Sequence, residues 1–292
     1  MPVKVLTAVE HSRHSRHLSN STHNHAIMTN ILEEIVAHKR LEVERFKSEL
    51  SEANIHTQVE AMLDTPPLSM KTSLLKSDTG IIAEMKRKSP SKGWINEHCN
   101  TNQIPFDYQE AGAAAISILT DEKFFGGSHD FMANAASRHI QTPMLYKNFV
   151  IDEYQIFQAR RSGASAVLLI AACLSKDECC TFIRTAHELQ LEVLLEMHNE
   201  HEAEYAELEP DLCGINNRNL DTFVVDIDTS SRLGKMLPQD AVKVSESGLS
   251  NAQTVRDLRA EGFNGFLIGE TFMKTANPGM ALKHFIDDIK SK

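Results

Sequence analysis

The sequence has no apolar run as long as the roughly 18 residues that a membrane-spanning helix needs. Its five cysteines do not fall at metal-ligand spacing, and an odd number without a signal peptide suits a reducing compartment. Basic residues are fewer than acidic ones, 30 against 40, which gives a formal net charge of −10. These shortages favour a cytoplasmic protein that binds neither membrane nor nucleic acid. An anionic ligand would then need a local basic pocket.

The first 27 residues are poor in acids and have no sustained hydrophobic period. They contain Glu10 as the single acid, together with five histidines and six Ser or Thr. This composition predicts a disordered tail over residues 1–27. Three alternatives stay open: a metal-binding His tract, an organelle transit peptide, and a native start at Met28.

Short apolar or β-branched runs recur along the rest of the chain, and charged amphipathic stretches separate most of them. Eight such strand–helix units predict an α/β fold, a (βα)8 TIM barrel with right-handed crossovers, in one domain over residues 28–292. With 292 residues, 41% of them hydrophobic, the chain can bury one large core. The runs begin near Ile81, Ala115, Pro143, Ala166, Glu192, Leu212, Val242 and Gly265.

One further helix is expected before the first run. From Asn30 to about Leu50, apolar residues fall among charges at roughly helical spacing. This predicts an extra amphipathic N-terminal helix outside the barrel. Its apolar residues are Ile31, Ile35, Leu41, Val43 and Phe46.

Polar side chains stand where many of the predicted strands end. In this fold, polar residues at the C-terminal ends of strands face the active site. Glu84 and Lys86 follow the first run, and alternation puts both on one face of the strand. A lone Glu at a strand end is more often an ion-pair partner, but here acids and bases converge and should shift one another's pKa values. The later strands add Lys147, Glu196, Asn216, Arg218, Glu246 and Ser247.

Seven segments, in barrel order, resemble a single family. From residue 28 to about 286 the chain is similar to indole-3-glycerol phosphate synthase, the tryptophan-pathway barrel that closes the indole ring. The segments are IIAEMKRKSPSKGWI (81–95), LTDEKFFGGS (119–128), YKNFVIDEYQI (146–156), LLEMH (194–198), GINNRNL (214–220), VSESGL (244–249) and FLIGETFM (266–273).

The resemblance implies a carboxy-lyase that uses neither metal nor organic cofactor. Its substrate would be 1-(2-carboxyphenylamino)-1-deoxyribulose 5-phosphate, which closes its ring and loses carbon dioxide and water. Lys147 would donate the proton to the carbonyl oxygen, and Lys86 would assist the dehydration. Glu84 and Glu196 would handle protons and stabilise cationic intermediates.

The expected substrate-binding residues form three groups. Loops after the seventh and eighth strands would bind phosphate through backbone amides, although turn geometry alone would also explain either glycine. An apolar wall would hold the anthranilate-sized ring, and polar strand-end residues would hold hydroxyls and the carboxylate. The groups are Ser247, Gly248, Gly269 and Glu270 with Ser89; Phe125, Phe149 and Pro90; and Asn216, Arg218 and Glu246.

Asn148 is a departure from the family, which commonly carries Asp there. Adjacent strand residues face opposite sides, so Asn148 should point away from the mouth if Lys147 points into it. Two rival functions stay open. One is a related phosphate-binding barrel such as phosphoribosylanthranilate isomerase, and the other is a non-catalytic scaffold. A monomer with a small phosphorylated substrate is expected.

A chain that begins at Met28 should fold, melt and turn over like the full chain, because residues 1–27 are expected to make no packing contacts. Thermal melting and an activity assay measure both. Deletion onward to Ser51 is the contrasting variant and should lower the Tm, because it removes an apolar helix face. A large loss of Tm in the Met28 chain would contradict the prediction.

Overall fold

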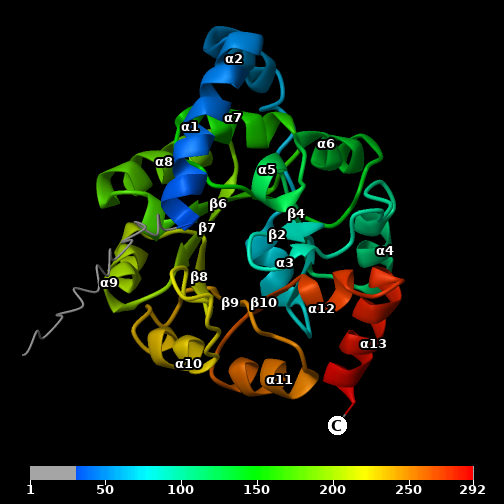
Figure 1. The fold of residues 1–292 in the computed structure, drawn as a ribbon. Helices are drawn as coiled ribbons and strands as arrows, with labels where there is room; N and C mark the ends of the chain where they lie inside the picture. Colours follow the sequence, from blue (N-terminus) through cyan, green and yellow to red (C-terminus); the bar gives the residue numbers. More distant parts are fainter. Residues whose placement is uncertain (1–30, 292) are drawn as a thin grey trace, which may run out of the picture.

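The computed structural model describes residues 31–291, so the tail predicted for residues 1–27 lies outside the described part. Within it, eight parallel strands close a barrel in the order β1-β10-β9-β8-β7-β6-β5-β4 (Figure 1). Six strands begin where the sequence predicts, and those expected at Pro143 and Val242 begin one residue later. The (βα)8 barrel is confirmed. Its strands are β1 (Ile81–Met85), β4 (Ala115–Leu119), β5 (Met144–Lys147), β6 (Ala166–Ile170), β7 (Glu192–Met197), β8 (Leu212–Asn216), β9 (Lys243–Glu246) and β10 (Gly265–Ile268).

Helices surround the barrel (Figure 1). Seven of those between and after the strands begin after a Ser, Asp or Asn whose side chain accepts a hydrogen bond from the first turn: Asp121, Ser128, Asp152, Ser175, Asn199, Asn251 and Asn277. The helices between and after the strands are α4 (Ile104–Ala111), α5 (Glu122–Phe125), α6 (His129–Ser137), α7 (Glu153–Arg161), η1 (Ala171–Cys173), α8 (Lys176–Glu188), α9 (Glu200–Ala203), η2 (Glu204–Leu208), α10 (Asp228–Gly234), α11 (Ala252–Ala260), α12 (Glu270–Met273) and α13 (Pro278–Lys290).

Strand side chains alternate between two cores. In β1, Ile82 packs inside the barrel with Leu145 and Leu194, whereas Ile81 and Ala83 pack outward against the helices. The residues after β1 form a short hairpin, β2 (Lys88–Ser89) with β3 (Gly93–Trp94), where the sequence predicted only a turn.

The predicted N-terminal helix is α1 (Ile31–Glu49), and two helices that the sequence did not predict follow it, α2 (Glu52–Glu60) and α3 (Met70–Lys76). Ile35 and Val43 are buried as expected. Placing Leu41 on the apolar face was wrong, because its side chain is 70% exposed. The buried face of α1 carries Lys39 and Glu42 instead, which stand close to Ile35 and Val43 on the helical wheel.

A buried ion cluster fastens α1 to the barrel. The Lys39 ammonium donates to Glu42 and, at 2.7 Å, to Asp121 Oδ2. Lys39 is 1% exposed and Asp121 is fully buried. The other oxygen of Asp121 accepts N–H bonds from Phe124 and Phe125. Lys39 therefore links the N-terminal helix to α5, which Asp121 caps and which carries Phe125.

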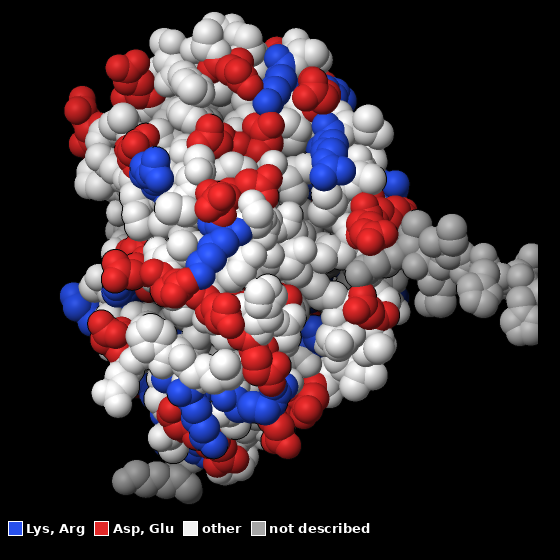
Figure 2. All heavy atoms as spheres, turned by 90° about the vertical axis from the view of Figure 1, so that its left-hand side faces the viewer, with Lys and Arg blue, Asp and Glu red and all other residues white. Residues whose placement is uncertain are grey.

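The surface has an acidic character. On the face drawn in Figure 2, which is the side of Figure 1 that carries α8 and α9, Asp and Glu are spread among scattered Lys and Arg. This agrees with the formal net charge of −10. Across residues 31–291, no helix combines the length and the apolar composition needed to cross a bilayer.

Replacement of Lys39 by Met should lower the free energy of unfolding by about 3 kcal/mol, because it leaves two buried carboxylates without their cation. Urea denaturation measures the loss. Glu34→Gln, which alters an exposed pair on the same helix, is the control and should stay within about 0.5 kcal/mol of the parent. Equal stabilities of the Lys39→Met variant and the parent would show that the cluster does not anchor α1.

Candidate active site

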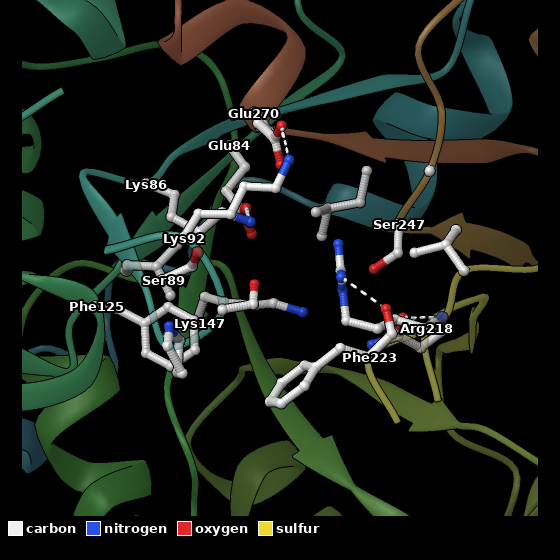
Figure 3. Close-up of a pocket in the computed structure, with 18 of the residues that line it drawn as sticks. Glu84, Lys86, Ser89, Lys92, Phe125, Lys147, Arg218, Phe223, Ser247 and Glu270 are labelled. Carbon is white, nitrogen blue, oxygen red and sulfur yellow. Dashed lines mark hydrogen bonds and ion pairs between the residues drawn. The ribbon is translucent and has the colours of Figure 1, made fainter. Parts of the chain in front are cut away.

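A cavity of about 450 Å³ opens at the C-terminal ends of the strands. Ile31, Leu32 and Ile35 of α1 contribute to its lining, so the N-terminal helix covers part of the mouth. Every predicted site residue lines this cavity except Glu246, which is 1% exposed and lies beneath it. The lining includes Glu84, Lys86, Ser89, Pro90, Phe125, Lys147, Phe149, Glu196, Asn216, Arg218, Ser247, Gly248, Gly269 and Glu270 (Figure 3).

Two buried carboxylates hold the Lys147 ammonium. Its Nζ lies 2.9 Å from Glu196 Oε2 and 2.7 Å from Glu246 Oε2. The other oxygen of Glu196 accepts a hydrogen bond from the Asn216 amide at 3.0 Å and lies 3.1 Å from His198 Nε2. The other oxygen of Glu246 has no hydrogen-bond partner among the residues that the structure describes. One ammonium therefore binds two carboxyl groups that differ in their other hydrogen-bond partners.

The pKa values of Lys147, Glu196 and Glu246 follow from this difference between the two carboxyl groups. Burial alone would lower the pKa of Lys147, but the neighbouring carboxylates, Glu196 foremost, outweigh it and hold that pKa above its ordinary value. Burial also opposes ionisation of Glu196, yet the charges of Lys147 and His198 keep its pKa well below the usual range. For Glu246, burial prevails and raises the pKa to about 8. At neutral pH the site holds an ionised Glu196 and a protonated Glu246.

Glu84 and Lys86 form a second ion pair at the mouth, with Lys86 Nζ 2.6 Å from Glu84 Oε1. Both face the cavity, as strand alternation predicts (Figure 3). A Cβ at residue 269 would lie 2.5 Å from Glu84 Oε1. The need for glycine at this position is therefore explained by the packing of Glu84.

Ser247, in the loop after β9, lies across the mouth from Phe125 and close to Arg218, whereas Glu270, after β10, lies beside Lys92 (Figure 3). Ser247 and Gly248 both have positive φ, 68° and 80°. A Cβ at residue 248 would lie 2.4 Å from the Val225 side chain, so glycine is required there for two reasons. The Glu270 carboxylate forms an ion pair with Lys92, with Oε1 lying 2.5 Å from Nζ.

Asn148 directly follows β5 and contributes to the cavity lining, which the prediction did not expect, but its amide group is turned to a buried network. Its Nδ2 donates to Thr120 Oγ1 at 2.8 Å and to the Tyr146 hydroxyl at 3.3 Å. That hydroxyl also lies 2.7 Å from His129 Nε2. Burial lowers the pKa of His129 to about 4, so this imidazole is neutral. Asn148 thus belongs to an uncharged network behind the lysine.

Sequence reasoning missed several residues at the site. Lys92 and Phe223 line the cavity, and His198 contacts Glu196 from outside it. Strand alternation could have found His198, since it stands two residues after Glu196 at the end of β7. Within residues 31–291, no group of three or more His, Cys, Asp or Glu could hold a metal ion.

Residues 32–285 match the family model described as indole-3-glycerol phosphate synthase. The chain belongs to the indole-3-glycerol phosphate synthase family. An indole-3-glycerol phosphate synthase of Bacteroides thetaiotaomicron is 51% identical over 264 residues, which cover 90% of this chain and all of that protein. One of Acidithiobacillus ferrooxidans is 42% identical, covering 89% of this chain and all of that protein. This family membership excludes the isomerase family as the alternative.

Solved structures with low sequence identity share the fold. A chain of the tryptophan synthase α2β2 complex of Pyrococcus furiosus matches with a TM-score of 0.54 at 14% identity, covering 74% of this chain and 99% of that chain. A 3-hexulose-6-phosphate synthase matches with a TM-score of 0.57 at 13% identity, covering 72% and 99%. At these identities the likeness concerns the barrel alone.

Replacement of Glu246 by Gln should make the protein relatively more stable as the pH rises from 4.5 to about 8. In this window an unfolded chain ionises Glu246, whereas the folded chain keeps it protonated because its pKa is about 8. The parent therefore loses stability that the Gln variant retains, by at most about 1.4 kcal/mol per pH unit. Urea denaturation at several pH values measures the difference.

The control for this series is Glu188→Gln on the exposed face of α8, which should show no such trend. A difference between the Glu246→Gln variant and the parent that stays constant with pH would show that Glu246 is ionised in the folded protein.

Proposed function

We propose that the side chains of this cavity carry out the family's reaction with Lys147 as the general acid. The reaction is the decarboxylating, dehydrating ring closure of 1-(2-carboxyphenylamino)-1-deoxyribulose 5-phosphate to indole-3-glycerol phosphate. The observation that carries the assignment is the position of Lys147. Its ammonium reaches into a largely apolar cavity and is fixed there by two carboxyl groups.

In the first step, the ring carbon that bears the carboxylate attacks the carbonyl carbon of the sugar chain. The carbonyl oxygen takes up a proton as its negative charge develops, and Lys147 supplies that proton. Glu246, protonated and 2.7 Å away, can return a proton to the lysine. Loss of carbon dioxide then restores the aromatic ring.

The last step removes the new hydroxyl group as water. Lys86 assists this departure, because its ammonium faces the same cavity and is paired with Glu84. Glu84 and Glu196 accept protons and stabilise the cationic intermediate that forms when the hydroxyl leaves. Two acid–base pairs therefore divide the two proton transfers between them.

Substrate binding uses the remaining walls. Phe125 and Phe149, with ring centroids 5.9 Å apart, offer an apolar surface for the anthranilate ring. The amides of Gly248 and Gly269 and the Arg218 guanidinium favour the phosphate end, opposite that surface. Lys92 forms an ion pair with the Glu270 carboxylate and offsets its negative charge, which would otherwise repel the phosphate.

We further propose that the protein is a cytoplasmic monomer. All five cysteines are free thiols, which suits a reducing compartment. Residues of α1 and of the barrel strands line the cavity together, so a single chain can form the pocket.

Replacement of Lys147 by Met keeps the length of the side chain and removes its proton. We expect kcat to fall by roughly 10² to 10⁴, the usual effect of losing a general acid, with substrate binding largely intact. A fluorescence assay for indoleglycerol phosphate measures the turnover.

Asn148→Asp is the matched control on the neighbouring residue and should change activity only modestly, because the Asn148 amide is hydrogen-bonded to Thr120 and Tyr146 and not to Lys147. Near-normal kcat in the Lys147→Met variant would mean that another group, Lys86 first, supplies the proton.

A crystal grown in sulfate should hold the anion between the loops that follow Glu246 and Ile268. Gly248, Gly269 and Arg218 line the cavity there, and sulfate, like a phosphate group, is a tetrahedral oxyanion. Difference density locates the ion. An anion bound elsewhere, with this region filled by side chains, would remove the phosphate assignment.

A further inference from the structure

A chain of charges continues outward from Lys147. Glu196 Oε1 lies 3.1 Å from His198 Nε2, and the opposite ring nitrogen, Nδ1, lies 2.9 Å from Glu202 Oε2. The His198 side chain is 8% exposed, and it does not line the cavity. The groups follow in the order Lys147 ammonium, Glu196 carboxylate, His198 imidazole and Glu202 carboxylate. Lys147 and Glu196 line the cavity, whereas His198 and Glu202 do not.

Glu202 is itself fixed in place. Its Oε2 accepts a hydrogen bond from the backbone N–H of His198 at 2.8 Å, and its Oε1 accepts one from the Asn199 amide at 2.6 Å. Asn199 in turn caps α9 through its side-chain oxygen, which accepts the N–H of Glu202. The turn between β7 and α9 thus presents a rigid carboxylate to the imidazole.

Both ring nitrogens of His198 face carboxylate oxygens. A neutral imidazole carries one N–H and one lone pair, so one of the two contacts would be repulsive. The imidazolium form is attracted to both carboxylates: Nδ1 is hydrogen-bonded to Glu202, and Nε2 is ion-paired with Glu196 at a distance of 3.1 Å without hydrogen-bond alignment. Burial lowers the pKa of His198, but Glu196 and Glu202 outweigh it and raise that pKa to about 10.

We propose that His198 is a positioning residue for the proton transfers at Lys147. Held by Glu202 on one side, it fixes Glu196 Oε1, so that Oε2 remains directed at the lysine ammonium in the mouth. Its positive charge keeps Glu196 ionised between two cations. The proposal depends on the proposed function, because it assumes that Glu196 acts as an ionised carboxylate in that reaction.

Two other titratable groups lie near this chain of charges. Cys173 of η1 is half-buried near Glu196 and Glu202, and burial raises the pKa of its thiol to about 12, so it stays neutral. Tyr205 of η2 has a raised pKa, first through burial and then through Cys179, Glu202 and Glu178, and also stays neutral. His198 is therefore the cationic group outside the cavity whose removal takes a positive charge away from Glu196.

The test compares pH–rate profiles of the full chain and its His198→Gln variant, with indoleglycerol phosphate formation as the readout. We expect kcat to fall about tenfold, or about 1.4 kcal/mol in the barrier, with KM little changed. The acid limb of kcat should move to higher pH by about one unit, because Glu196 loses a neighbouring positive charge. Glu202→Gln should shift it the same way by less, since it loosens the imidazole.

His201→Gln is the matched control, because His201 is 83% exposed and stands three residues along the same turn. It should leave kcat and the acid limb unchanged. If the His198→Gln variant fails to fold, an NMR titration of His198 in the parent tests the proposal instead. An imidazole that loses its proton near pH 6.5 would overturn it.

The outcomes separate the two proposals. A parent chain that does not turn over the substrate would overturn the proposed function. A parent that turns over, with a His198→Gln variant that keeps both kcat and the acid limb, would overturn the role of His198 alone. A folded variant that loses Tm but neither kinetic feature would show that His198 serves stability only.

Discussion

Competition between two buried carboxyl groups for one ammonium is the interaction on which the site depends. Lys147 cannot satisfy Glu196 and Glu246 equally, because two carboxylates a few ångströms apart in a dry pocket repel each other. Glu196 gains a hydrogen bond from Asn216 and the nearby positive charge of His198 and stays ionised, whereas Glu246 gains neither and keeps its proton. The partners around each carboxyl group decide its charge.

The barrel makes this competition unavoidable. Lys147, Glu196 and Glu246 stand at the ends of β5, β7 and β9, which are alternate strands of the closed sheet. Side chains from alternate strands meet in one layer inside such a barrel. Closure of the sheet therefore brings together charges that lie between 49 and 99 residues apart in the chain.

Elements outside the barrel hold the mouth in shape. The Lys39–Asp121 contact fixes α1 to the start of α5, which carries Phe125, so the cover of the cavity is joined to its aromatic wall. Glycines at 248 and 269 leave room for Val225 and Glu84. Both glycines are explained by packing, whether or not their amides also bind phosphate.

The sequence determined the fold class, the strand positions and the set of polar residues at the strand ends, because these follow from local periodicity and from the order of the motifs. It predicted α1 but misplaced Leu41, since the buried face of that helix carries Lys39 and Glu42 beside its apolar residues, and Asp121, the partner of Lys39, lies far along the chain. Tertiary structure alone decided which of two similar glutamates is ionised, because that depends on distances across the barrel. It also brought His198 to Glu196 and Glu202, a contact in which the charge of each group is set by the others.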